Sequence, residues 1–110
     1  MSGNQYDETR EKLQLEIQFA REQLIEGRPM SEVANELHGR GMGMLFFIFI
    51  FREATGVGIG DLKCFGPWWS DDSGVTNVQD FDAYANELNM QKHAIDWSDD
   101  DHNQIYIIGY

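Results

Sequence analysis

The sequence predicts a single-domain α+β protein that is mainly α-helical, with four to five helices and a small C-terminal β element. Apolar residues recur at spacings of three and four in two long segments, which is typical of amphipathic helices. Glycine and proline residues separate the segments. The last eight residues, NQIYIIGY, are rich in residue types favoured in strands. A chain of 110 residues can bury one core, so we assign 1–110 to one domain.

The N-terminal part is predicted to contain two helices. Residues 6–26 form the first, which ends before Gly27 and Pro29. The second is short, covers 32–38 and has Ser31 as its N-cap. The expected buried positions are Leu13, Ile17, Ala20 and Leu24 in the first helix, and Val33 and Leu37 in the second.

The run MLFFIFIF at residues 44–51 fits either a buried strand or the start of a buried helix. Its Phe and Ile residues favour a strand, whereas its continuation through Arg-Glu-Ala toward Gly56 favours a helix with a glycine C-cap. We expect a helix over 44–54. We also expect Gly58 and Gly60 to allow a close approach to the next helix.

Two further helices are predicted in the second half of the chain. A short helix over 59–65 ends before a Gly-Pro pair, and the stretch WWSDDSG that follows is expected to be a loop. Thr76 and Gln79 have the spacing of a capping box for a helix of roughly 77–90. Its expected buried stripe is Val78, Phe81, Ala85 and Leu88.

The β element is predicted at residues 103–110. We expect this strand to pair with the segment 93–97. The intervening stretch SDDDHN would form the connection, although it lacks the residue pair typical of a two-residue hairpin turn.

The stretch FREATGVGIGDLK, residues 51–63, resembles the helix–turn–helix in the C-terminal domain of the bacterial ribosomal stalk protein. The resemblance implies two packed helices and a surface that docks translation factors. The same glycines do not form a Walker phosphate loop, because Asp61 stands where such a loop needs lysine and then Ser or Thr. The residues that fit the stalk pattern are Arg52, Thr55, Gly56, Val57, Gly58, Ile59, Asp61 and Lys63.

Negative charge is concentrated in the second half of the chain. Residues 1–63 carry a net charge of −3 and residues 64–110 a net charge of −8, with Lys92 as the only base of the second part. A total of −11 argues against direct nucleic-acid binding, because phosphate contacts need Lys and Arg. No signal peptide or membrane span is expected, since the longest apolar run has eight residues and a span needs about 20. The single cysteine, Cys64, excludes an intramolecular disulfide, and we expect a cytoplasmic protein.

We expect the acids and tryptophans of the second half to form a face that binds a basic protein. The acidic stretches would speed encounter with a cationic partner, and an aromatic residue beside acids is typical of a hot spot for Arg-rich surfaces. The same composition also fits a solvated acidic surface with tryptophans at the edge of the core. The predicted partner-binding residues are Trp68, Trp69, Asp71, Asp72, Asp80, Asp82, Trp97, Asp99, Asp100 and Asp101.

This profile is similar to that of small acidic bacterial immunity proteins, which bind a toxin domain and block its active site. The expected function is therefore that of a non-enzymatic inhibitor of a basic toxin domain, such as a nuclease. No catalytic residue, cofactor or metal is predicted. The twelve-residue segment 96–107, DWSDDDHNQIYI, lacks the glycine and the final glutamate of a calcium loop, and the histidines lack zinc-site spacing.

Two alternatives remain open at this level. One is a small enzyme or ligand-binding domain that uses Cys64 with His93 or His102, although an apolar neighbourhood predicts a buried, inert cysteine. The other is a docking module for ribosome-associated factors that binds through the turn at 52–63, as the stalk resemblance implies. The oligomeric state is not predicted.

Overall fold

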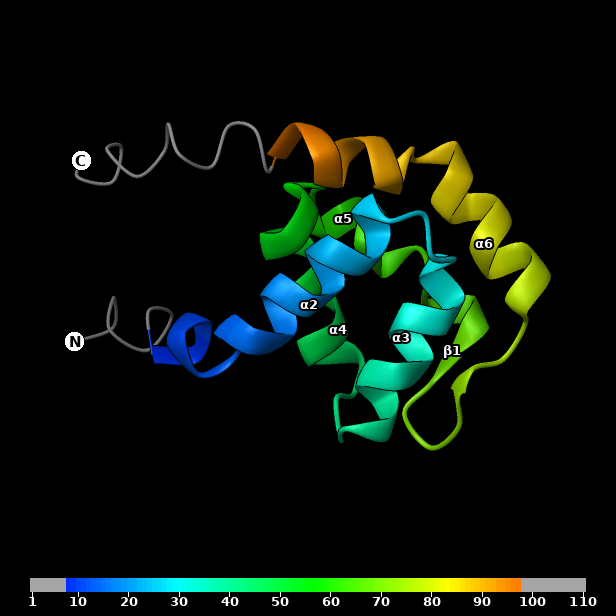
Figure 1. The fold of residues 1–110 in the computed structure, drawn as a ribbon. Coiled ribbons are helices and arrows are strands. Elements are labelled where there is room, and N and C mark those ends of the chain that lie inside the picture. The colour runs from blue at the N-terminus through cyan, green and yellow to red at the C-terminus, as the bar shows by residue number, and fades with distance from the viewer. Residues whose placement is uncertain (1–7, 98–110) are drawn as a thin grey trace.

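Helices make up most of the computed structural model, which describes residues 8–97 (Figure 1). Together with one small antiparallel sheet they confirm the predicted fold class. Helical segments at 8–12 and 90–97 flank the elements named below. In chain order these elements are α2 (Gln14–Ile25), α3 (Met30–Gly39), α4 (Met44–Thr55), α5 (Ile59–Lys63), the 3-10 helix η1 (Gly66–Trp68), β1 (Trp69–Ser70), β2 (Gly74–Val75) and α6 (Val78–Glu87).

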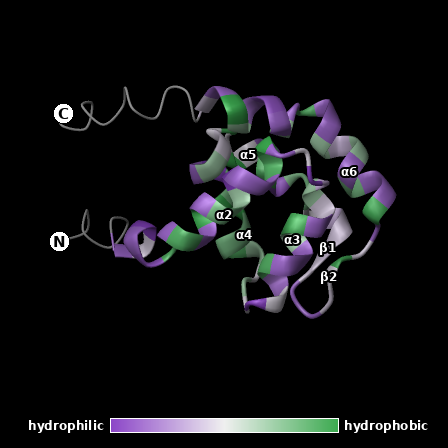
Figure 2. Cartoon of the chain, viewed as in Figure 1, coloured by the Kyte–Doolittle hydropathy of each residue, from purple (hydrophilic) through white to green (hydrophobic). Residues whose placement is uncertain are grey.

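Phenylalanine rings form the centre of the core. The ring centroid of Phe47 lies 4.9 Å from that of Phe51, 5.7 Å from that of Phe65 and 6.0 Å from that of Phe81. Around them α2 packs across α4, and α3 packs against both α2 and α6. The hydrophobic residues gather where these helices meet (Figure 2). The six positions predicted to be buried in the first two helices are all buried.

The run at 44–51 is helical, as expected, and forms most of α4. A helix suits this run because Phe47, Ile50 and Phe51 follow one another at helical spacing and are fully buried. The predicted glycine C-cap is confirmed. Gly56 has a left-handed φ of 77°, and its N–H donates to the main-chain oxygen of Arg52 at 2.7 Å.

The close approach expected at Gly58 and Gly60 is found at Gly56 instead. A Cβ added at Gly58 or Gly60 would meet no atom within 4 Å, and both residues are exposed. A Cβ added at Gly56 would lie 2.7 Å from Cε3 of Trp97. The glycine of this turn that brings parts of the chain together is therefore the one that also ends α4.

Helix boundaries differ from the prediction near the N-terminus. Backbone geometry breaks at Leu13, but Leu13 N–H still bonds to Thr9 and Ile17 N–H to Leu13, so the apolar stripe continues. Helix α3 begins at Met30 rather than at 32. Ser31 is therefore not the N-cap, because the extended backbone of Pro29 precedes the helix and Ser31 already lies inside it.

The stretch WWSDDSG is a hairpin rather than a loop. Trp69 pairs with Val75 and Ser70 with Gly74, and Gly74 has a φ of 82°. The side chain of Asn35 on α3 accepts a hydrogen bond from Val75 N–H at 2.9 Å, which ties the hairpin to α3. The preceding Gly-Pro pair starts the 3-10 helix instead of ending helical structure, because proline is tolerated in a first helical turn.

The N-cap of α6 is Asn77, and the predicted capping box on Thr76 is wrong. Asn77 Oδ1 accepts the main-chain N–H of Asp80 at 3.0 Å. This register leaves Val78 53% exposed, whereas Phe81 and Ala85 are buried as predicted and Leu88 is half-buried.

The segment 93–97, predicted to pair as a strand, is helical. Asn89 has a φ of 57°, which ends the preceding helical stretch earlier than the predicted 90. Met90 and Ala94, four positions apart, then face the core, so helical spacing buries both. The strand predicted at 103–110 lies outside the described residues. None of the helices within 8–97 is both long and apolar enough to cross a membrane.

Candidate functional site

Asp71, one of the predicted partner-binding acids, caps α4. Its Oδ1 accepts hydrogen bonds from Met44 N–H at 2.7 Å and from the indole N–H of Trp69 at 2.9 Å. The main-chain oxygen of Asp71 lies 2.9 Å from Nε2 of His38. The hydrogen bond from Trp69, and next that from Met44, lower the pKa of Asp71. A carboxylate at a helix N-terminus is favourable, so the fold itself accounts for this acid.

Asp80 and Asp82 also serve helix N-termini. Asp82 accepts hydrogen bonds from Ser31 N–H at 2.8 Å and from the buried Ser31 hydroxyl at 2.7 Å, which ties α6 to the start of α3. Asp80 Oδ2 accepts from the Asn77 side chain at 3.1 Å, reciprocating the N-cap hydrogen bond. Three of the predicted partner-binding acids therefore have structural roles within one chain.

Two of the three tryptophans are held by the fold. The ring of Trp69 stacks on Phe47 at a centroid distance of 5.1 Å and an interplanar angle of 26°. Trp97 donates its indole N–H to the main-chain oxygen of Glu53 at 2.8 Å and covers Gly56. Both rings therefore complete the edge of the core.

Asp72 differs from these acids because its carboxylate has no hydrogen-bond or ion-pair partner within residues 8–97. It lies in the turn between β1 and β2, where its main-chain N–H donates to the Ser70 hydroxyl at 3.1 Å. The remaining predicted acids, Asp99, Asp100 and Asp101, lie outside the described part of the chain.

The structure brings Trp68 together with residues that the sequence interpretation had not grouped with it. The Trp68 ring lies beside Tyr84 at a centroid distance of 5.8 Å, and Tyr84 in turn packs edge-on against Phe65 at 4.8 Å. The Tyr84 hydroxyl donates to the main-chain oxygen of Asp61 at 3.0 Å. We call this surface the Trp68 face; it consists of Asp61, Cys64, Trp68, Tyr84 and Glu87.

The residues of the Trp68 face include two acids, Asp61 and Glu87, and no base. Burial of the hydroxyl raises the pKa of Tyr84 to about 12, and Cys64 and the charges of Asp61 and Glu87 add to the increase. Tyr84 was missed as a site residue, although helical spacing gives a signal for it. Tyr84 lies three residues from Phe81 and from Glu87, so a ring and an acid are expected at one edge of the apolar stripe of α6.

Cys64 is exposed, which contradicts the expectation that its apolar neighbours bury it. Leu62 and Phe65 point into the core, and helical geometry turns Cys64 outward, with its Sγ 3.5 Å from the main-chain oxygen of Gly60. No histidine hydrogen-bonds to Cys64 within residues 8–97. His93 is exposed, and the other candidate, His102, lies outside that range.

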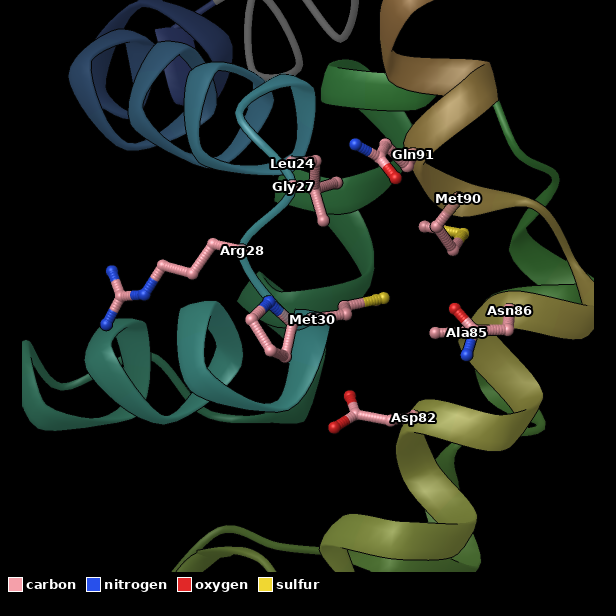
Figure 3. A pocket seen from close by; sticks show the side chains of 10 residues that line it. Leu24, Gly27, Arg28, Met30, Asp82, Ala85, Asn86, Met90 and Gln91 are labelled. Carbon is pink, nitrogen blue, oxygen red and sulfur yellow. The ribbon is translucent and has the colours of Figure 1, made fainter.

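A cavity of about 280 Å³ lies between the α2–α3 turn, α6 and the segment 90–97 (Figure 3). Asp82 faces it, but this carboxylate is already bound by Ser31. Arg28 extends away from it and donates to Glu36 at 2.8 Å. Both charged residues of the lining are therefore occupied, and we assign no ligand. The lining consists of Leu24, Gly27, Arg28, Pro29, Met30, Asp82, Ala85, Asn86, Met90 and Gln91.

A larger share of the bases than of the acids has a partner within the fold. All eight bases and fifteen of the nineteen acids lie within residues 8–97. Five bases have an acid, a main-chain oxygen or an aromatic ring as partner, namely Arg10, Arg21, Arg28, Arg40 and Lys92. In the same range the carboxylates without a hydrogen-bond or ion-pair partner are Glu8, Glu11, Glu16, Glu26, Asp61, Asp72 and Glu87.

No group of three or more metal-ligating side chains is present in the part of the chain that the structure describes. Helices α4 and α5 pack together around the turn at Gly56. Comparisons of the chain with protein-family models, with curated proteins and with solved structures found no match.

Proposed function

We propose that this protein is a non-enzymatic inhibitor that binds a basic protein domain and covers its functional surface, in the manner of bacterial immunity proteins and antitoxins. The partner is a cationic toxin domain, such as a nuclease, encountered in the cytoplasm. The proposed action requires no cofactor, metal or direct contact with nucleic acid.

The observation that carries the proposal is the excess of unoccupied negative charge on the surface. Seven carboxylates have no hydrogen-bond or ion-pair partner within residues 8–97, against three bases, Lys12, Arg52 and Lys63. The ion pairs of the fold join four bases to four acids and cancel equal amounts of charge, so the excess of acids over bases within residues 8–97 remains. A surface of this kind attracts a cationic protein over a distance of about one Debye length.

Inhibition then follows because this protein occupies the substrate-binding surface of the toxin domain. A nuclease binds its substrate through cationic side chains that contact phosphates. An anionic protein seated on those side chains excludes the substrate by volume and removes the positive potential that attracts it. Complementary charge chiefly raises the association rate, so the association should weaken as salt increases.

The test begins with capture of the partner from the source cells on immobilised protein, at about 50 mM and about 500 mM salt. The purified partner is then titrated with this protein while the partner's own activity is measured. We expect a basic partner, inhibition that is complete at a stoichiometric ratio, and weaker affinity at the higher salt. An acidic partner, or one that stays fully active at saturation, would contradict the proposal.

Charge-neutral variants supply the matched control. One triple variant carries Asp61→Asn in α5 together with Asp72→Asn and Glu87→Gln in the second half of the chain. The other carries the Glu→Gln change at Glu8, Glu16 and Glu26, which removes the same charge from the N-terminal helices. Neither set breaks an internal contact, so both should fold normally. The first set should slow association more than the second, and equal effects would mean that net charge alone is responsible.

A further inference from the structure

The Trp68 face combines an aromatic pair with two unoccupied carboxylates. Trp68 and Tyr84 are half-buried, with ring centroids 5.8 Å apart and an interplanar angle of 52°. The Tyr84 ring is fixed, because its hydroxyl donates to Asp61 and its edge packs on Phe65. Part of each ring therefore remains at the surface, and the Tyr84 ring is held in a set orientation.

The acids of this face are free to bind an external group. The fold uses the main-chain oxygen of Asp61 but leaves its carboxylate without a partner among the described residues, and the same holds for Glu87. Both carboxylates are close enough to Tyr84 to raise its pKa. Lys63 is the nearest base in sequence to Asp61 and Lys92 the nearest to Glu87. Lys63 forms no ion pair with either acid, and Lys92 pairs with Asp96.

We infer that the Trp68 face binds an arginine side chain of the partner, with the guanidinium plane against the exposed ring surface and its N–H groups directed to Asp61 and Glu87. This inference deepens the proposed function and rests on it for the identity of the partner. Arginine fits better than lysine for two reasons. A planar guanidinium stacks on aromatic rings, and its forked donors can serve two carboxylates at once.

The probes are nona-arginine and nona-lysine peptides, which carry equal charge, titrated calorimetrically at about 50 mM salt. The native protein should bind nona-arginine about five-fold or more tightly than nona-lysine. The double variant D61N/E87Q should lose about ten-fold in affinity for nona-arginine. The variant E16Q/E26Q, with the same charge change on or beside α2, should lose about two-fold at most. Equal binding of the two peptides, or equal losses in the two variants, would overturn the inference.

Substitution of the ring separates stacking from charge. Trp68→Phe keeps an aromatic ring next to Tyr84 and should preserve most of the preference for arginine, whereas Trp68→Ala should remove the preference while residual binding of both peptides persists. Unfolding by urea identifies any loss of fold in the alanine variant, and the phenylalanine variant and D61N/E87Q then decide the question. A Trp68→Ala variant that folds and still prefers nona-arginine would contradict the stacking geometry.

The inference and the proposed function can fail separately. If the captured partner is inhibited normally and its affinity is unchanged in D61N/E87Q, the Trp68 face is not the arginine site and the inhibitory function stands. If the peptides show the preference but the captured partner retains full activity, the arginine site stands and the inhibitory function is wrong.

Discussion

Replacement of Gly56 by alanine is expected to destabilise the fold by about 2 to 4 kcal/mol. Gly56 has a φ of 77°, and a residue with a Cβ costs about 1 to 2 kcal/mol in that left-handed region. The added Cβ would lie 2.7 Å from Cε3 and 3.0 Å from Cζ3 of Trp97, so the indole ring must move. That movement strains the hydrogen bond from Trp97 to the Glu53 oxygen, which contributes about 1 kcal/mol.

The free energy of unfolding should be measured in urea by far-ultraviolet circular dichroism, because tryptophan fluorescence would itself respond to the displaced ring. Gly60→Ala is the matched control. Gly60 lies in α5, is exposed, and an added Cβ meets no atom within 4 Å, so alanine should stabilise by up to about 1 kcal/mol. The two substitutions are chemically identical, and the structure predicts opposite signs.

The double variant G56A/W97A separates the two causes. If the ring is what the Cβ meets, the effects of the two single substitutions should sum to more than the effect of the double variant. A loss below about 1 kcal/mol for Gly56→Ala, or full additivity in the double variant, would refute the contact between Gly56 and Trp97.

Three further predictions use the same unfolding assay. Asn77→Ala should lower the free energy of unfolding by about 1 kcal/mol because it removes the N-cap of α6. Thr76→Ala should change it by less than about 0.5 kcal/mol. A larger loss at Thr76 would support the capping box predicted from sequence. The pKa of Asp71 is lower in the folded state than its ordinary value of 3.8. The carboxylate therefore stabilises the fold above pH 3.8, and this stabilisation is lost as the pH falls through the lower folded-state pKa. Asp71→Asn should therefore be less stable at neutral pH and lose less on acidification, and parallel pH profiles would contradict the cap. The pKa of Tyr84 is raised to about 12 from an ordinary value of 10.0, so the neutral hydroxyl stabilises the fold fully below pH 10 and this stabilisation declines as the pH rises toward 12. The urea midpoint of the native protein should fall over this pH range, and that of Tyr84→Phe should lack this decline.

The helices that face the core could be predicted from the sequence because periodicity records burial directly. The stripe from Leu13 to Leu24 and the pair Phe81 and Ala85 are buried as the pattern predicts. The ambiguous run at 44–51 was decided correctly by its glycine terminator, whose left-handed φ only a few residue types adopt readily. Local chemistry was sufficient in these cases because a single helix with a single buried face was involved.

Predictions failed where a distant residue decides the local structure. The hairpin after Trp68 depends on Asn35, forty positions earlier, which binds Val75 N–H. Ser31 has the composition of an N-cap but lies inside α3, where Asp82 accepts its hydroxyl and N–H. No window along the sequence contains both partners of either contact, so the pattern alone could not reveal them.

The candidate site was partly predictable for the same reason. Composition identified tryptophans beside acids as the surface of interest, and Trp68 lies in such a setting. The acids beside it, however, are Asp61 and Glu87, which come from other helices, and not its sequence neighbour Asp71. Proximity in sequence did not indicate these two carboxylates, because the chain turns into β1 directly after Trp68.

This division of the acids determines how the proposed function must be tested. Neutralising Asp71, Asp80 and Asp82 together removes contacts at three helix N-termini, so a loss of partner binding in that variant would follow from a weakened fold as readily as from a lost interface. Neutralising Asp61 and Glu87 removes no internal contact of the described chain. Only the second set changes the surface while leaving the fold unchanged, and loss of partner binding in a variant with native stability can be assigned to the interface.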